Sequence, residues 1–435
     1  MLTDEPIIAF EETGGSAAGA KLIPYTMSSL LAFRSAILPW IGDLLLRRPV
    51  IASGRAYVSV SPATRQPRVT AGGLPVGLPS EGAYLGADLA EPFRSILVTN
   101  DSIASLTDVN EWQMATLCQL IASRDLTFIS VWSPSFLLRL LDALTNGMEV
   151  IKARLGGQPE PMDRLTRAFA GGRFCTEILW PSLDTISCWT DGPSRVMAQQ
   201  LARWFPSIFI EPKGILATES AISLPWGTPP NSLPALLSAF LEFVDESGQE
   251  RLVDEVSEGQ EYRIVLTTPG GLYRYDIGDR VRCTGHTGLV PRFEFLGRAG
   301  LVSDLVGEKL TEDFVCRIVG ELEWPAMLVA QIQPEPHYEL WIDCRGSEVS
   351  VTLARDVEGR LKSNPQYAYA RALGQIGPLS LMCKPGFIRE CHDALLAKGR
   401  RLGDLKSVSL QPWKDRKSTR LNSSHIQKSR MPSSA

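Results

Sequence analysis

The chain has 435 residues, of which 44% are hydrophobic and 21% charged, and its formal net charge at pH 7 is −4. This length and composition are typical of a globular protein of two or three domains with a sizeable buried core. No concentrated basic face is available for the phosphates of a nucleic acid, so we expect no nucleic-acid partner.

The first distinctive stretch, FEETGGSAAGAKLIPYT at residues 10–26, places glycines, hydroxyls and one lysine between two apolar segments. A Walker-type phosphate loop requires G-x-x-x-x-G-K-[ST]. Gly14 and Gly19 have this spacing, but Lys21 does not directly follow the second glycine and Leu22 replaces the hydroxyl. The composition is that of a phosphate-binding loop of another kind, although for this segment taken alone a mobile glycine linker is the stronger interpretation.

Two features bear on the cellular compartment. The apolar stretch at residues 28–46 is interrupted by Arg34, Pro39 and Asp43, which are costly inside a bilayer, so we expect a pair of helices against a core and no membrane span. The eight cysteines contain no C-x-x-C pair. We therefore expect reduced thiols in a cytoplasmic protein.

Further along, apolar runs alternate between strand and helix patterns. TEILW at 176–180 and TISCW at 185–189 predict short strands, and residues 194–205 have the apolar spacing of a helix. Residues 207–220 then predict another strand that ends on Thr218 and Glu219. An acid just beyond the carboxyl end of a buried strand lies where open α/β sheets bind ligands. The alternative is that Glu219 only caps the next segment.

From residue 240 the pattern changes to antiparallel strands, namely FLEFV at 240–244, EYRIVLTT at 261–268 and GLYRYDIGDRVRCTG at 271–285. In the last of these, Gly278 predicts a turn with positive φ, and Asp279 would present its carboxylate there. A carboxylate is suited to accept hydrogen bonds from two vicinal hydroxyls. A turn with a solvated aspartate is the alternative.

Taken in order, ETGGSAAGAKLIPYT, GILATES and GLYRYDIGDRVRCTG resemble the three nucleotide motifs of the auxin-responsive GH-three family of acyl acid amido synthetases. That family belongs to the adenylate-forming superfamily, together with acyl-CoA synthetases and luciferases. The resemblance also includes LTFISVWSPSFLLRLL, LWPSLDTISCW and FEFLGRAGLVSDLVGEKLTE, and it runs from Phe10 to Trp413.

This resemblance implies a mixed α/β (α+β) adenylate-forming fold. Residues 1–297 would form a large domain of α/β sheets with a small β-barrel-like sheet, and residues 298–415 a small, mobile α+β domain. We expect that an N-terminal part of the large domain is missing. Residues 416–435 lack apolar periodicity and acids, so we expect a disordered, non-native tail.

The resemblance also assigns residues to ATP and Mg²⁺. Glu219 and Thr218 would lie near the phosphates and the magnesium ion, and Asp279 would bind the ribose. Arg298 would lie at the passage from the large to the small domain. The residues implied to embrace the phosphates are Thr13, Gly14, Gly15, Ser16 and Lys21.

Further residues are implied in catalysis and in binding the acyl acid. Lys309 matches a lysine that contacts phosphate, and Lys406 is the counterpart of a late lysine on the small domain. By resemblance, Trp132, Phe136 and Leu137 border the acid, although a plain core role is the stronger alternative for each.

The resulting hypothesis is an ATP-dependent ligase that activates a small carboxylic acid as an acyl-adenylate and transfers the acyl group to an amino-acid amine. Transfer to a thiol such as coenzyme A is one alternative, and a catalytically silent nucleotide- or acyl-binding protein is another. A Ser-His-Asp hydrolase is disfavoured because GGSAAG is not G-x-S-x-G. The sequence sets no oligomeric state, and a monomer is plausible.

Overall fold

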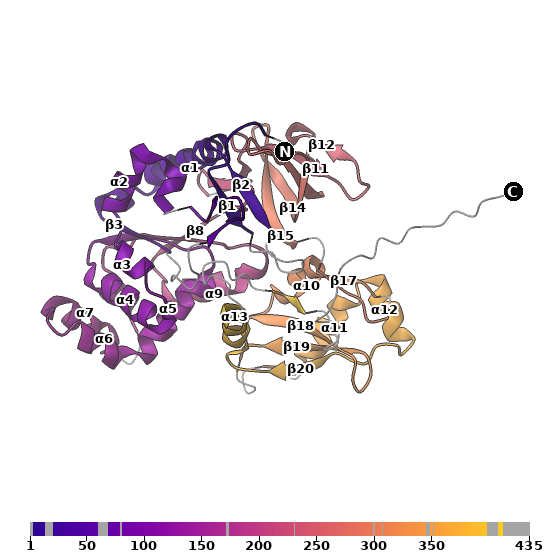
Figure 1. Ribbon diagram of the computed structural model, residues 1–435. Helices are drawn as coiled ribbons and strands as arrows, with labels where there is room; N and C mark the ends of the chain where they lie inside the picture. The colour runs from indigo at the N-terminus through magenta and orange to yellow at the C-terminus, as the bar shows by residue number, and fades with distance from the viewer. Residues whose placement is uncertain are drawn as a thin grey trace.

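The chain folds into mixed α/β structure with several separate sheets (Figure 1). The elements that follow residue 298 lie together in Figure 1, and we refer to residues 301–411 as the C-terminal segment. The computed structural model describes residues 3–13, 21–59, 68–78, 81–170, 174–229, 231–298, 301–306, 308–344, 349–350, 352–397 and 408–411.

The N-terminal sheet has the strand order β2-β1-β5-β4. Its strands are β1 (Ala9–Glu12), β2 (Leu22–Tyr25), β4 (Arg68–Val69) and β5 (Pro75–Val76). Strands β1 and β2 are antiparallel, so the segment between them is the connection of a hairpin. Thr26 directly follows β2 and caps the first helix, because its hydroxyl accepts a hydrogen bond from the Ser29 N–H.

Helix α1 (Met27–Arg47) is one continuous helix of 21 residues, so the expected helix pair is wrong. Pro39 lies inside it; the helix continues on both sides because Trp40 and Leu44 pack in an apolar cluster with Leu224. By length and mean hydropathy alone, α1 is long and apolar enough to cross a membrane. Core helices of soluble proteins pass the same test.

A parallel sheet with the order β3-β6-β7-β8 follows: β3 (Arg55–Val58), β6 (Leu126–Ser130), β7 (Thr185–Cys188) and β8 (Phe209–Pro212). Its helices are α2 (Ala87–Ser95), α3 (Asp101–Ala104), α4 (Val109–Ala122), α5 (Pro134–Asn146), α6 (Met148–Arg154), α7 (Pro159–Phe169), α8 (Thr176–Leu179) and α9 (Arg195–Trp204). The largest apolar cluster lies between this sheet and its helices, and it includes the fully buried Trp112, Ile129 and Ile186. The strand predicted near 185 and the helix near 194 are confirmed. The strand predicted at residues 207–220 is confirmed only in its first part: β8 ends at Pro212, so its predicted end on Thr218 and Glu219 is wrong.

The strand predicted at residues 176–180 is wrong, because Thr176–Leu179 forms the single helical turn α8. Tertiary contacts decide this conformation. The Thr176 hydroxyl donates to the Trp204 carbonyl at 2.8 Å, and the Trp180 indole N–H donates to the Leu120 carbonyl at 2.9 Å. A short apolar run does not distinguish a strand from a buried helical turn by its spacing.

The next sheet is antiparallel with the order β12-β11-β13-β14-β15, as predicted from residue 240 onward. Its strands are β11 (Phe240–Val244), β12 (Glu250–Arg251), β13 (Glu261–Thr267), β14 (Tyr275–Thr287) and β15 (Val290–Arg298), and the pair β9 (Ser223–Trp226) and β10 (Asn231–Pro234) precedes them. Gly278 has a positive φ of 76° but lies inside β14. The expected turn is therefore wrong: neighbouring strands pair on both sides, and the residue sits in a bulge opposite β13.

The C-terminal segment contains a four-stranded sheet with the order β20-β19-β18-β21. Its elements are β16 (Val302–Ser303), β17 (Leu310–Thr311), α10 (Glu312–Val319), β18 (Ala326–Gln331), β19 (His337–Ile342), α11 (Leu353–Leu361), α12 (Pro365–Ala372), β20 (Ser380–Cys383), α13 (Phe387–Ala397) and β21 (Leu410–Gln411). Leu395 and Leu396 on α13 pack against the N-terminal core. Short 3₁₀ helices lie at Pro49–Ser53, Glu81–Leu85, Gly192–Ser194 and Val253–Glu255.

Candidate nucleotide and acid site

Thr13 and Lys21, the residues on either side of the glycine-rich stretch at 14–20, lie beside each other next to the antiparallel pair β1 and β2. The Thr13 N–H donates to the Lys21 carbonyl at 2.8 Å, and the Lys21 N–H donates to the Thr13 hydroxyl at 3.1 Å. The two residues predicted to flank the phosphates are thus fixed beside each other. Gly14, Gly15 and Ser16 lie outside the described residues.

Two side-chain contacts, one from Lys21 directly before β2 and one from Tyr25 on β2, gather the three motif segments. The Lys21 ammonium donates to the Tyr275 hydroxyl at 3.1 Å and lies 5.4 Å from the centre of that ring, at the start of β14. The buried Tyr25 hydroxyl donates to the Thr218 carbonyl at 2.6 Å. Segments far apart in the sequence therefore meet at one hairpin.

The segment at Thr218 and Glu219 lies in an acidic environment. Burial raises the pKa of Tyr25 well above its ordinary value, and the nearby Glu11 and Glu219 carboxylates raise this pKa further. Tyr25 therefore stays a neutral hydrogen-bond donor. Within the ranges that the structure describes, no group of three or more His, Cys, Asp or Glu side chains could hold a metal ion by itself. Glu219 could thus hold Mg²⁺ only together with phosphate oxygens and water, the arrangement that Mg²⁺ commonly adopts.

Asp279 follows the bulge of β14, is only 4% exposed, and pairs in register with Arg298 at the end of β15. The sheet thus places the residue predicted to bind ribose beside the residue predicted at the domain passage. Tyr275, which contacts Lys21, lies earlier on the same strand. One strand therefore connects the phosphate end and the ribose end of the predicted nucleotide site.

A second polar group lies at the carboxyl ends of the parallel strands. Lys213 follows β8 and is 4% exposed, and its ammonium donates to the Ser130 hydroxyl at 2.7 Å and lies 3.4 Å from that of Ser187. Its Nζ also lies 5.7 Å and 5.3 Å from the ring centres of Trp40 and Trp132. Sequence reasoning missed Lys213, because a single lysine after a strand is ordinary.

The three residues predicted to border the acid separate in the structure. Phe136 and Leu137, each 1% exposed, belong to the large apolar core, where Phe136 packs against Trp112. Trp132 is half-buried and contacts Trp189, with 5.8 Å between ring centres. Of these three residues, Trp132 is the one for which the contacts described above include the Lys213 ammonium.

The two lysines predicted on the small domain, Lys309 and Lys406, fall within the C-terminal segment by their positions in the sequence. Lys309 is exposed and has a positive φ of 46°, which is uncommon for a residue other than glycine. The buried Glu308 beside it accepts hydrogen bonds from the Leu305 and Val306 N–H groups at 2.8 and 2.9 Å, which fixes the backbone there. Lys406 lies outside the described residues.

Two family models match the chain. The GH3 family N-terminal domain matches residues 1–210, and the GH3 family central domain matches residues 233–298. Both matches end at or before residue 298, and the predicted division at 297/298 stays a prediction.

Among curated proteins, the chain is 23% identical to the indole-3-acetic acid-amido synthetase GH3.4 of Arabidopsis thaliana, over 98% of this chain and 82% of that protein. It is 25% identical to a GH3 domain-containing protein of Homo sapiens, over 58% of this chain and 54% of that protein. The alignment with the plant enzyme thus includes the C-terminal segment.

Among solved structures, AtGH3.15 acyl acid amido synthetase in complex with 2,4-DB superposes with a TM-score of 0.83 at 18% identity, over 95% of this chain and 81% of that chain. A 2-hydroxyisobutyryl-CoA ligase in the postadenylation state superposes with a TM-score of 0.52 at 10% identity, over 95% and 74% of the two chains. The mixed α/β adenylate-forming fold is confirmed. Because the two family models together span more than half of its residues and the fold agrees, the chain belongs to the GH3 family.

Proposed function

We propose that this protein is an ATP-dependent ligase that activates a carboxylic acid as an acyl-adenylate and transfers the acyl group to the amine of an amino acid. The observation that carries the proposal is a pair of contacts, from Lys21, directly before β2, to Tyr275 and from Tyr25 on β2 to Thr218, which gathers the three motif segments. The relatives named as amido synthetases support the same reaction.

In this proposal the acid's carboxylate oxygen attacks the α-phosphorus of ATP, and pyrophosphate leaves. Two anions must approach each other, so positive charge and fixed donors lower the barrier. Lys21 and the Thr13 hydroxyl would hold the phosphates, Glu219 would hold Mg²⁺, and Asp279 would accept the ribose hydroxyls. Magnesium would supply further positive charge at the phosphates.

In the second step the neutral amine nitrogen attacks the acyl carbon, AMP leaves, and the nitrogen loses a proton to complete the amide. The exposed Lys309 beside the anchored Glu308 is the proposed phosphate contact from the C-terminal segment. Lys406 keeps its predicted role as the late lysine.

We propose that the acid lies at the carboxyl ends of β6, β7 and β8. Ligands of open α/β sheets bind at such edges. Lys213 supplies a cation there, and Trp132 and Trp189 supply aromatic surface. This arrangement favours an acid with an aromatic group, and the plant relative is named for an indole acid.

The test is pyrophosphate release from ATP and Mg²⁺ across a panel of aromatic and aliphatic acids, with and without amino acids, and separately with coenzyme A. Acid-dependent release together with an amide product is the expected result. Release followed by a thioester only with coenzyme A would favour the acyl-CoA type of ligase. ATP binding without pyrophosphate release from any acid would support a silent binding protein.

A further inference from the structure

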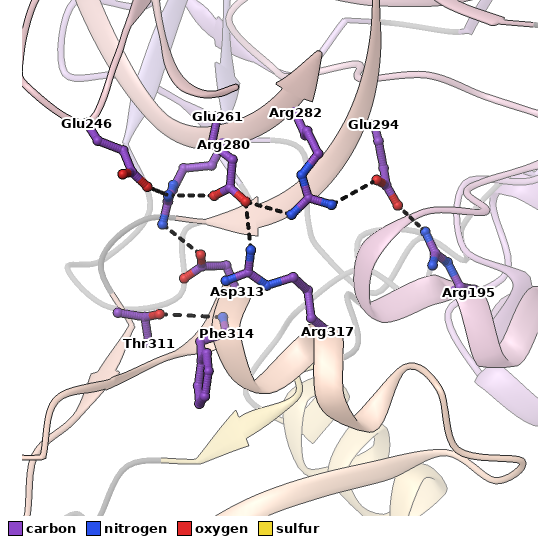
Figure 2. Close-up of polar contacts among 10 residues, drawn as sticks. All are labelled: Arg195, Glu246, Glu261, Arg280, Arg282, Glu294, Thr311, Asp313, Phe314 and Arg317. Carbon is purple, nitrogen blue, oxygen red and sulfur yellow. Dashed lines mark hydrogen bonds and ion pairs between the residues drawn. The ribbon is translucent and has the colours of Figure 1, made fainter. Parts of the chain in front are cut away.

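A row of charged side chains crosses strands β13, β14 and β15 of the antiparallel sheet, on the face that meets the C-terminal segment (Figure 2). Arg282 on β14 lies in register between Glu261 on β13 and Glu294 on β15. Its guanidinium lies 2.6 Å from Glu261 Oε1 and 3.6 Å from Glu294 Oε2. Arg195, the first residue of α9, pairs with the same Glu294.

Helix α10 of the C-terminal segment adds two charges to this row, one helical turn apart (Figure 2). Arg280 Nη1 lies 2.6 Å from Asp313 Oδ2, and Arg317 Nη1 lies 2.6 Å from Glu261 Oε1. Arg280 Nη2 also lies 2.8 Å from Glu261 Oε2. Arg280 therefore joins a carboxylate of the sheet to a carboxylate of the helix through the two Nη atoms of one guanidinium, whose planar, forked donors suit such a bridge.

The backbone of β15 leaves space for this contact. Gly297 lies in register opposite Arg280 and has a φ of 144°, a conformation that L side chains rarely adopt. A Cβ on Gly297 would lie 3.7 Å from both the Cα and the Cβ of Asp313. The start of α10 thus packs directly on the strand, and Thr311 fixes that start by accepting the Phe314 N–H.

Asp313 depends on Arg280. Its side chain is only 2% exposed, and its Oδ1 has no hydrogen-bond partner within the described part of the chain. A buried carboxylate is costly unless it is paired. Loss of the guanidinium would leave this carboxylate buried beside Glu261, so α10 would move away from β15.

Arg280 directly follows Asp279 on β14, and consecutive strand residues point to opposite faces of a sheet. We propose that Arg280 is a positioning residue that couples the docking of α10 to the hold of Asp279 on ATP. The inference rests on the proposed role of Asp279. Coupling of this kind is reciprocal, so bound ATP strengthens the docking of α10 by the same factor as docked α10 strengthens ATP binding.

The first experiment measures the Kd of ATP by calorimetry on the full chain and on four variants: Arg280→Gln, Asp313→Asn, their double mutant, and Arg389→Gln. Arg389 forms a 2.6 Å ion pair with Asp142 that also joins the C-terminal segment to the rest, so it is the matched control. We expect Arg280→Gln and Asp313→Asn each to raise the Kd of ATP about tenfold, within the usual range of coupling between sites. The Kd of ATP for the double mutant should equal that of Arg280→Gln or of Asp313→Asn, because the two substitutions remove the same ion pair. The control should stay within about twofold.

A second measurement separates coupling from a structural role. ATP should slow hydrogen exchange of residues 312–319 in the wild type and in Arg389→Gln, but not in Asp313→Asn. If Arg280→Gln does not fold, Asp313→Asn still tests the coupling from the helix side, because Asp313 is no part of the proposed nucleotide site.

The outcomes distinguish this inference from the proposed function. If the wild-type protein binds no ATP, the proposed function is wrong, and so is the proposed effect of α10 docking on ATP binding. Wild-type binding combined with an unchanged Kd in both single variants overturns the coupling alone. Equal ATP protection of residues 312–319 in wild type and Asp313→Asn does the same.

Discussion

The Nζ of Lys21 lies 3.1 Å from the hydroxyl of Tyr275 and 5.4 Å from the centre of its ring, so the base of the glycine-rich loop is joined to the strand that carries Asp279. The contact is made by the side chain rather than by backbone pairing. The Lys21 ammonium is therefore fixed in direction near the loop, and a fixed cation costs no reorganisation when charge develops on a phosphate.

We predict that Lys21→Ala slows acid-dependent pyrophosphate release by roughly 10²–10³-fold, the usual loss for one preorganised donor. The fold should persist, because the side chain is exposed. Lys152→Ala, which removes a half-buried lysine paired with Glu149 on α6, is the control and should leave the rate unchanged. Unchanged pyrophosphate release in Lys21→Ala would remove Lys21 from the mechanism.

A second prediction concerns the anchor of the middle motif. Tyr25→Phe removes the 2.6 Å hydrogen bond to the Thr218 carbonyl and leaves the ring in place. The lost bond should lower the free energy of unfolding by about 1 kcal/mol. If the anchor also positions Glu219 for Mg²⁺, the variant should need more Mg²⁺ for half-maximal pyrophosphate release. A magnesium titration identical to that of the wild type would limit Tyr25 to a structural role.

Much of the architecture follows from patterns within short windows of sequence. The antiparallel strands after residue 240 alternate apolar and polar residues because one face of the sheet packs on its core, which contains Phe243, Ile264 and Val281. The errors arose where tertiary contacts decide. Gly278 has the positive φ expected of a turn, but strand pairing on both sides of β14 turns that signal into a bulge.

In the candidate site too, residues within local motifs could be predicted, and residues that depend on tertiary contacts could not. Order along the chain predicts which segments carry Lys21, Thr218 and Asp279, because each lies within a recognisable motif. The role of Tyr275 as a partner of Lys21 has no local signature, since it depends on how the fold places the residue before β2 against the start of β14. Lys213 has none either, because the rings around it come from Trp40 and Trp132, on other elements.

The third prediction tests whether the acid lies at Lys213. Lys213→Met keeps the length of the side chain and removes the charge, so the KM for the acid should rise by about ten- to a hundredfold, the worth of one charge-assisted hydrogen bond. The KM for ATP should stay the same. Lys213→Arg, which keeps the charge, should show a smaller increase. An unchanged KM for the acid in Lys213→Met, in a variant that folds, would leave Lys213 a packing residue between its two tryptophans.

The last prediction concerns acid stability at the contact between α13 and α5. His392 on α13 is 3% exposed, and burial, reinforced by the nearby Arg139, lowers its pKa from 6.5 to about 4, although Asp393 opposes the shift. Between these two values the unfolded chain binds a proton that the folded chain does not, so the free energy of unfolding should fall as the pH decreases from 6.5 to about 4. The shift corresponds to roughly 3 kcal/mol at most.

Urea denaturation at pH 7.5, 6, 5 and 4.5 measures this slope. His392→Leu removes the titrating group, so its stability should fall less steeply over the same interval, whatever its stability at pH 7.5. Parallel curves for wild type and His392→Leu would show that His392 titrates alike in the folded and unfolded chains, because only a difference in bound protons between the two states makes stability depend on pH.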